Sequence, residues 1–547
     1  MMKKFKQIPL LPLLASSAVL LAACSEDPSQ SSASSTMSTS TASAAAPAPV
    51  AKPLGIRPHG DTTADIDMSL VHNDDLKEVF AYIDENIDQH VINLQKWIQQ
   101  PSISNTGEGI QESAYMVEGF FDQLGCQETT VYDVGITEWG QQGNPVVYAK
   151  CDEGAEKTLV VYWMYDTMPI TQPDLWKSPP FAAELMPQAP FPLVMVGRGT
   201  ANSKGRQMAF WNAMMSIKAT TGKLPVNLIF VAEGDEERMS IGYRKFVREH
   251  PELFAGADAM WGGGGSEGCV FVELITSGES WGRGPNYSNI HGGNKRSVDA
   301  PAWRHIQMLS TLVDETGNKV MIDGFYDDIE PLTAAEDERL RKSAANFNVD
   351  VAATNLGVAR FIADDPYEVT KMRRYGTSMN LDGIWGGNMF EGGSGAILPN
   401  RIVSKHNFRY LPAQDGMDIV DKLRTHLDKH GYEDVEINVV GDVPWAKVTN
   451  DSDLHVAANE MRAAFGMAPN ELSSDETMLG GYWPAYLFSG DVLNIPIASG
   501  MVGSGGNSHA ANEFYVVEGA GGTWGMADSE KSVAMTLYSW AGLNKPE

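Results

Sequence analysis

The stretch Gly197-Arg198-Gly199-Thr200-Ala201-Asn202-Ser203-Lys204-Gly205 decides the fold, because it leads through a glycine-rich turn into a helical segment over 205–220. On either side lie two short runs of apolar and β-branched residues, 158–163 and 226–232, each typical of a buried strand. A strand, a helix and a second strand in this order predict an α/β sheet whose loops gather at the carboxyl ends of the strands. An amphipathic helix with apolar residues every three or four positions over 79–98 precedes them.

Length and composition bound the class of protein. The chain has 547 residues, of which 43% are hydrophobic and 20% charged, so it is a globular protein long enough for more than one domain. Its 41 Lys and Arg against 70 Asp and Glu give a net charge of −29. A surface this acidic repels phosphate backbones, and we therefore expect no nucleic-acid partner.

The N-terminus has the pattern of a secretory signal. Lys3, Lys4 and Lys6 precede an apolar stretch that is too short and too often interrupted for a membrane span, and that ends in Leu21-Ala22-Ala23-Cys24. This ending resembles the bacterial lipobox, in which the cysteine becomes the lipidated first residue. The resemblance implies a signal peptide over 1–24, a lipid anchor to the membrane at Cys24, and a cell-envelope location. Ser25 after the cysteine favours the outer membrane, facing the periplasm.

A low-complexity segment follows Cys24. From Ser25 to about Pro53 the sequence is almost wholly Ser, Ala, Thr and Pro, which cannot bury enough apolar surface to offset the entropy of ordering. We therefore expect a disordered tether over 25–69 and a folded part beyond it.

The three remaining cysteines are Cys126, Cys151 and Cys269. They are too few for a disulfide scaffold, and none is closely spaced with another. The plain interpretation is that they are small buried apolar side chains. Whether any of them pair stays open at the level of the sequence.

Four polar motifs occur at intervals along the chain. They are Tyr165-Asp166-Thr167-Met168-Pro169, the Gly197–Gly205 stretch, Glu233-Gly234-Asp235-Glu236-Glu237, and Asn507-Ser508-His509-Ala510-Ala511-Asn512-Glu513. The first and third directly follow predicted strands. Trp176-Lys177-Ser178-Pro179-Pro180-Phe181 and Phe408-Arg409-Tyr410-Leu411-Pro412 accompany them.

In their order and spacing these motifs resemble the dinuclear zinc peptidases typified by carnosine dipeptidase, glutamate carboxypeptidase and succinyl-diaminopimelate desuccinylase. The resemblance implies an α/β catalytic domain, a mixed sheet flanked by helices, assembled from 70–276 and 446–547. It also implies an inserted α+β ferredoxin-like lid and dimerisation domain over 277–445, and hence a homodimer.

Some of the family's functional positions are intact. In this family a Glu acts as general base on a metal-bound water, and the next Glu and a late His bind metal. By resemblance the general base is Glu236, and the metal ligands are Glu237 and His509. Asp166 corresponds to the residue that orients a metal-binding His.

Other ligand positions have changed. The first His of the family corresponds to Met164, the bridging Asp to Asn202, and a second Asp to Gly264, with Glu267 close enough to be its displaced equivalent. A thioether does not replace imidazole on zinc, and an amide offers one weak oxygen without charge. We therefore expect one zinc ion, held by Glu237, His509 and the Asn202 carbonyl, or none; two ions are not expected.

The predicted lid carries two candidate substrate-binding residues. Arg409 could bind a substrate carboxylate bidentately or be an ordinary exposed arginine. The family's dipeptidase branch has a His that reaches the partner subunit's active site, and here Tyr287 stands at that position, with His291 nearby.

Three functions remain open from the sequence. The first is hydrolysis of amide bonds in small peptides or acylated amino acids, with Glu236 as general base and at most one metal. The second is a binding protein that retains the fold without the chemistry, and the third is metal-free acyl transfer or amide formation. The retained Glu236 and His509 favour an enzyme, and the changed Met164, Asn202 and Gly264 favour the binding protein.

Overall fold

A six-stranded mixed sheet, in the order β1-β2-β6-β3-β7-β14, forms the centre of the catalytic part of the computed structural model, which describes residues 54–478, 480–490 and 492–546. The strands β6, β3, β7 and β14 run parallel, while β1 and β2 are antiparallel additions at one edge. The bounds are β1 Glu128–Tyr132, β2 Val146–Cys151, β3 Thr158–Met164, β6 Asn227–Glu233, β7 Ala259–Trp261 and β14 Ile497–Ala498. The predicted α/β sheet and both predicted strands are confirmed.

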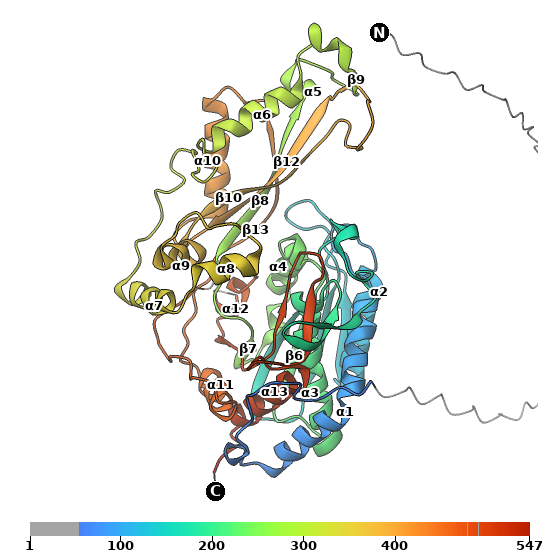
Figure 1. Cartoon of the computed structure of the whole chain (residues 1–547), viewed down its shortest axis with the longest axis vertical. Helices are drawn as coiled ribbons and strands as arrows, with labels where there is room; N and C mark the ends of the chain where they lie inside the picture. The colour runs from blue at the N-terminus through green and yellow to red at the C-terminus, as the bar shows by residue number, and fades with distance from the viewer. Residues whose placement is uncertain (1–53, 479, 491, 547) are drawn as a thin grey trace, which may run out of the picture. The chain divides into compact units, whose positions relative to one another are not determined.

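Helices cover both faces of this sheet (Figure 1). Alternation along β3 shows why: Leu159, Val161 and Trp163 face one apolar core, and Val160 faces the other. The first core is closed by α1 (Asp74–Gln99), α2 (Ile110–Leu124), α3 (Gly205–Thr221) and α13 (Met526–Trp540), with α11 (Asp453–Ala464) packed on α13. The second is closed by α4 (Ile241–Glu249) and α12 (Tyr486–Ser489).

A small antiparallel sheet, in the order β15-β16-β5-β4, brings two distant motifs together. Its bounds are β4 Glu184–Gln188, β5 Phe191–Val196, β15 Gly505–Gly506 and β16 Phe514–Glu518. Phe514 of β16 pairs with Val196 of β5. The loop that carries His509 therefore lies beside the turn that begins at Gly197.

The inserted lid has its own antiparallel sheet, in the order β10-β12-β8-β13. Its strands are β8 Gly268–Ser277, β10 Ser378–Trp385, β12 Arg401–Tyr410 and β13 Glu436–Val443. Helices α6 (Pro301–Leu312) and α10 (Gly416–Lys429) pack on its apolar face. The smaller elements are α5 Gly278–Trp281, β9 Ile290–His291, α7 Ala334–Ala345, α8 Val349–Leu356, α9 Pro366–Tyr375 and β11 Ile397–Leu398. β8 begins at Gly268, before the residue 277 at which we expected the insertion to start.

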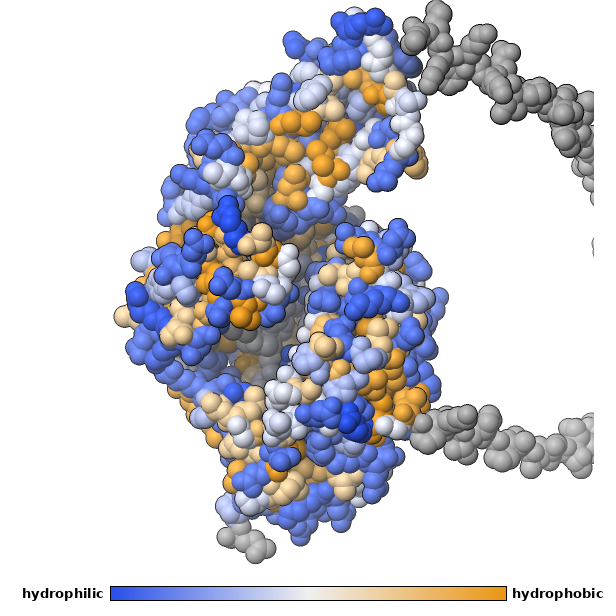
Figure 2. Space-filling view, in the orientation of Figure 1, coloured by the Kyte–Doolittle hydropathy of each residue, from blue (hydrophilic) through white to orange (hydrophobic). Residues whose placement is uncertain are grey.

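The edge strand β10 and the loop after it expose large apolar side chains. Leu381, Ile384, Met389 and Phe390 are between 46% and 88% exposed. Figure 2 shows hydrophobic residues gathered on the upper part of the molecule, over the lid elements labelled in Figure 1.

The N-terminal part of the described chain is more ordered than the sequence predicts. Ile56 is buried in the first core. The backbone N–H groups of Gly55 and Ile56 donate to the Asp88 carboxylate, and Arg57 pairs with Glu518 at 2.8 Å. The prediction of a disordered tether up to residue 69 was therefore wrong for 54–69, because these contacts tie the segment to α1 and β16. Residues 1–53, including Cys24, lie outside the described residues.

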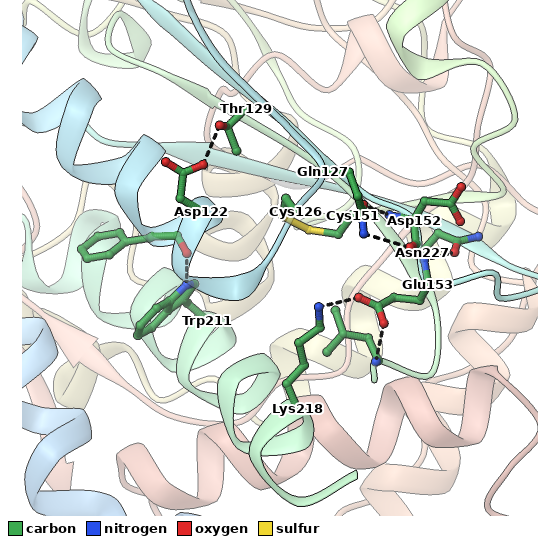
Figure 3. Close-up of a disulfide and its surroundings, with 12 residues drawn as sticks. Asp122, Cys126, Gln127, Thr129, Cys151, Asp152, Glu153, Trp211, Lys218 and Asn227 are labelled. Atoms are coloured by element: carbon green, nitrogen blue, oxygen red, sulfur yellow. Dashed lines mark hydrogen bonds and ion pairs between the residues drawn. A yellow bond between two sulfur atoms is a disulfide. The ribbon is translucent and has the colours of Figure 1, made fainter. Parts of the chain in front are cut away.

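Cys126 and Cys151 form a disulfide (Figure 3). β1 pairs antiparallel with β2, so that Glu128 faces Lys150, and this register brings Cys126, in the turn between α2 and β1, beside Cys151 at the end of β2. The Gln127 side chain exchanges hydrogen bonds with the Asp152 backbone next to the bridge. The sequence left the pairing of these two cysteines open, and the plain interpretation of them as small buried apolar side chains does not hold; Cys269 is free and buried.

Among the described helices, none has the length and apolar character needed to cross a membrane.

Candidate active site

The carboxyl ends of β3 and β6 bring the first and third motifs together. Met164 of β3 lies opposite Glu233 of β6, so the residues that follow each strand are neighbours. The buried Asp166 carboxylate accepts the backbone N–H groups of Glu236, at 3.3 Å, and Glu237, at 3.0 Å. Asp166 thus fixes the turn that presents both glutamates. Its burial, followed by the charge of Glu237, raises the pKa of Asp166 to about 8.

Three side chains from three separate loops meet at one point. Asn202 Nδ2 lies 2.9 Å from Glu237 Oε1 and 3.0 Å from His509 Nε2, and these two atoms are themselves 3.0 Å apart. The Glu237 side chain is 3% exposed, whereas the imidazole is half exposed. Its hydrogen bond with Glu237 raises the pKa of His509 above the usual value. We call these three residues the polar triangle.

Hydrogen atoms alone cannot satisfy every side of the polar triangle. If His509 Nε2 carries a proton, it donates to Glu237 and faces an N–H of Asn202. If Nε2 is unprotonated, it accepts from Asn202 and faces a carboxylate oxygen. Rotation of the Asn202 amide exchanges Nδ2 for Oδ1, and three lone-pair donors then converge on one point.

This geometry fits a single metal ion. Bonds of about 2.0–2.1 Å from a tetrahedral zinc ion place neighbouring ligand atoms about 3.3 Å apart, close to the sides of the polar triangle. Glu237, His509 and the Asn202 carbonyl would supply three protein ligands, the usual number for a catalytic site. Across the described chain, no three side chains of the His, Cys, Asp and Glu types are grouped to hold an ion. In the polar triangle the third donor would be the amide of Asn202.

The positions expected to hold a second ion, Met164 and Gly264, carry no carboxylate or imidazole. Met164 presents a buried thioether. Gly264 has no side chain, its carbonyl accepts the indole N–H of Trp483, and its φ of +99° disfavours a side chain at this position. Glu267, the alternative candidate for this position, pairs with Arg409 at 3.0 Å.

A buried ion pair positions the loop that carries Asn202. Glu513 Oε2 accepts from the Arg198 guanidinium at 2.7 Å and from the backbone N–H of Gly199 at 3.0 Å. Glu513 Oε1 accepts the backbone N–H groups of Ala201 and Asn202, each at 2.9 Å. Sequence reasoning did not assign a role to Arg198 or Glu513. The available signal was that Arg198 lies in the same motif as Asn202, and Glu513 in the same motif as His509.

Glu236 lines a cavity of about 320 Å³ that Asn202 of the polar triangle also lines. Burial, followed by the neighbouring charge of Glu237, raises the pKa of Glu236. Within the described residues, the Glu236 carboxylate accepts no hydrogen bond and forms no ion pair. It is therefore free to accept a proton from a bound molecule or to pair with one.

The two lid candidates lie in different settings. Arg409 is held by Glu267 and by Asn407, and its guanidinium lies over the Tyr482 ring at 4.5 Å. Its positive charge partly offsets the rise in the pKa of Glu236 that burial and the neighbouring carboxylates cause. Tyr287 is 89% exposed on the lid, and the structure of the single chain does not bring it to the polar triangle.

The sequence profile described as peptidase family M20/M25/M40 matches residues 164–520, which include the polar triangle and Glu236. The chain belongs to this family. Its M20 relatives include a Cys-Gly metallodipeptidase of Candida albicans, which is 27% identical over 478 residues and matches across 80% of this chain and 93% of its own length. The Beta-Ala-His dipeptidase of Homo sapiens is 24% identical over 472 residues, covering 81% and 90% of the two chains.

A solved M20 structure agrees with this assignment. The M20 family metallo-carboxypeptidase from Sulfolobus solfataricus is 27% identical, has a TM-score of 0.67, and covers 83% of this chain and 99% of its own. The predicted family and fold class are thereby confirmed, and with them the expectation of a peptidase-type enzyme.

Proposed function

We propose that this protein hydrolyses amide bonds of small peptides or acylated amino acids, with Glu236 as general base and one metal ion held by Glu237, His509 and Asn202. The observation that carries the proposal is the polar triangle, in which three side chains converge with sides of 2.9–3.0 Å. The unpaired Glu236 carboxylate beside it supplies the base. A binding protein has no evident need for either arrangement.

Each residue around the polar triangle has a separate role in the proposed reaction. A bound ion would act as a Lewis acid and make water more acidic. Glu236 takes the proton from the attacking water and delivers it to the leaving amine. Asp166 holds the backbone of both glutamates, and the Arg198–Glu513 pair holds the loop of Asn202. These supports keep the reacting groups in place without reorganisation.

Small peptides are the substrate class that the comparisons support. The named relatives act on Cys-Gly and on Beta-Ala-His, both of which are dipeptides. We carry over only the class, because identities of 24–27% do not fix a side-chain preference. Arg409 is a candidate for contact with a peptide carboxylate, provided that a substrate displaces Glu267 from it.

We also propose that the protein is lipid-anchored at Cys24 in the bacterial cell envelope, at the outer membrane facing the periplasm. The Cys126–Cys151 disulfide supports an oxidising compartment outside the cytoplasm. Detection of an acylated Cys24 by mass spectrometry of membrane fractions would support the anchor, and an unprocessed, soluble chain would overturn it.

A homodimer is our proposal for the lid. The exposed apolar residues of β10 and of its following loop form an unpaired sheet edge of the kind that joins subunits. Ile384→Glu should convert a dimer to a monomer in sedimentation experiments without unfolding the chain. A parent chain that is already monomeric at micromolar concentration would contradict the proposal.

The function is tested by metal content and hydrolysis together. Full-length chain should retain about one zinc per chain by elemental mass spectrometry and should cleave dipeptides, and His509→Ala should lose both properties. A parent chain that takes up no metal and cleaves no peptide would overturn the proposal in favour of a binding protein.

A further inference from the structure

The cavity next to the polar triangle has a wall of aromatic rings. Six residues with ring or thioether side chains line it: Tyr162, Met164, Phe210, Trp261, Tyr482 and Trp483. The rings pack in pairs, with 5.3 Å between the centroids of Phe210 and Trp261 and 5.8 Å between those of Tyr162 and Trp483. Met164 stands at a position expected to hold a second ion, and here its thioether is part of an apolar wall.

The polar atoms of two of these rings are already paired. The Tyr162 hydroxyl donates to Glu233 at 2.6 Å, and the Trp483 indole N–H donates to the Gly264 carbonyl at 3.1 Å. These residues therefore offer ring surface, rather than O–H or N–H donors, to a molecule in the cavity. Such a surface favours an aromatic group, because the group is buried and packs ring against ring.

The cavity is large enough for one ring. Its volume of about 320 Å³ is roughly twice that of an apolar cavity of about 150 Å³ that holds benzene in another protein. A phenol or indole ring would therefore leave room for water beside Glu236 and Asn202, which line the same cavity.

One buried acceptor in the cavity lacks a donor. Gln207 of α3 lines the cavity and is 8% exposed, and its Oε1 has no hydrogen-bond partner among the described residues. An unpaired buried acceptor costs free energy. A ring that carries an O–H or N–H group would remove this cost, whereas a phenyl ring would not.

We infer that this cavity receives a phenol or indole side chain of the substrate, which belongs to a residue next to the scissile bond and donates its O–H or N–H to Gln207. Asn202 belongs both to the polar triangle and to the cavity lining. Standard bond lengths place a Cβ atom about 2.5 Å from the carbonyl carbon of its own residue. The side chain can therefore lie in the cavity while the peptide bond lies at the polar triangle.

The inference rests on the proposed function and narrows its substrate class to molecules that contain tyrosine or tryptophan. Neither of the dipeptides named for the relatives, Cys-Gly and Beta-Ala-His, carries a phenol or indole ring. The preference therefore comes from the residues of this chain.

Dipeptides with and without a ring test the inference on the full-length chain. Gly-Tyr is compared with Gly-Ala, and Tyr-Gly with Ala-Gly, by isothermal titration calorimetry, and by kcat/KM where a peptide is cleaved. The exposed Arg206 at the cavity could attract the carboxylate of any peptide, but this contribution cancels within each pair. We expect a preference for tyrosine of at least about tenfold in one of the two pairs, as is typical for the burial of a large side chain. A smaller ratio in both pairs would overturn the inference.

A comparison of tyrosine with phenylalanine assigns the effect to Gln207. In the preferred position, tyrosine should exceed phenylalanine by at least about fivefold, because only the phenol satisfies the buried amide oxygen. Gln207→Leu and Gln207→Met remove the amide at similar volume and should bring this ratio to one or below, while the ratio of phenylalanine to alanine stays at the parent value. Gln123→Leu, on the exposed face of α2, is the matched control and should keep both parent ratios. A tyrosine-to-phenylalanine ratio that persists in both Gln207 variants would overturn the inference.

The inference and the proposed function fail separately. Tighter binding of the tyrosine peptides, dependent on Gln207 but without any hydrolysis, would leave the ring site standing and overturn the enzyme. Hydrolysis of all these peptides at equal kcat/KM would leave the enzyme standing and overturn the ring site.

Discussion

His509 Nε2 lies 3.0 Å from Glu237 Oε1, although one residue belongs to the loop before β16 and the other follows β6. The pairing of β16 with β5 brings the first loop in, and the Asp166 carboxylate holds the second. Asn202 touches both atoms through one amide nitrogen. The charge at position 202 therefore bears directly on how tightly an ion is held.

Asn202→Asp should raise the affinity for zinc. A carboxylate adds a negative charge and removes the N–H donors that compete for Glu237 and His509, and we expect at least a tenfold gain. Isothermal titration with zinc would measure it. Asn346→Asp, at the exposed end of α7, changes the net charge equally and should leave the affinity at the parent value. A variant no tighter than the parent would show that residue 202 is not a ligand.

Glu236→Gln should abolish turnover while keeping the metal. Loss of a general base typically lowers kcat by roughly 10²–10⁴-fold, and among the described residues the Glu236 side chain forms no hydrogen bond with the polar triangle. Dipeptide hydrolysis and zinc content, measured on the same sample, separate the two effects. The exposed Glu252→Gln serves as the control. Parent-like kcat in Glu236→Gln would assign the base to another residue.

Removal of the disulfide should destabilise the catalytic part. Cys126 and Cys151 are 25 positions apart, and a bridge across such a loop typically contributes about 3 kcal/mol to the free energy of unfolding. Urea unfolding of the Cys126→Ser, Cys151→Ser double variant should show this loss. Dithiothreitol should destabilise the parent and leave the double variant unchanged; equal sensitivity of both would mean that the bridge does not form.

Asp442 should make the stability depend on pH. It accepts the hydroxyl of Tyr410 at 2.6 Å, and burial raises the pKa of Asp442 from 3.8 to about 6. Between these two values the unfolded chain ionises while the folded chain holds its proton, so stability falls as the pH rises through this window. The full difference is about 3 kcal/mol.

The Asp442→Asn variant isolates that effect. The difference in free energy of unfolding, variant minus parent, should increase as the pH rises from 4 to 7, because the asparagine does not ionise. Urea unfolding at several pH values measures the difference. A difference that stays constant over this range would contradict the assigned pKa.

Sequence patterns predicted the elements that hold the site. Glu236 and Glu237 follow a buried apolar strand, and this placement fixed their position at the sheet edge. The motif around His509 predicted that His509 would lie beside these two glutamates. The register of β16 against β5, which accomplishes this, leaves no signal in either strand alone.

Features that depend on tertiary contacts between separate helices and strands could not be predicted from the sequence. Gln207 sits among core residues of α3, and its sequence position does not show that its oxygen lacks a partner. The disulfide depends on the β1–β2 register. Ile56 is one apolar residue in a polar stretch, and its burial follows from contacts with α1 and β16.

The backbone at Gly264 bears on the history of this protein. With φ at +99° and its carbonyl committed to Trp483, this position does not readily accept an aspartate even if a single base change were to introduce one. Under the proposed one-ion site, a return to two ions would need a new backbone conformation here in addition to new side chains at positions 164 and 202. Single substitutions at any one of these positions would each leave the second site incomplete.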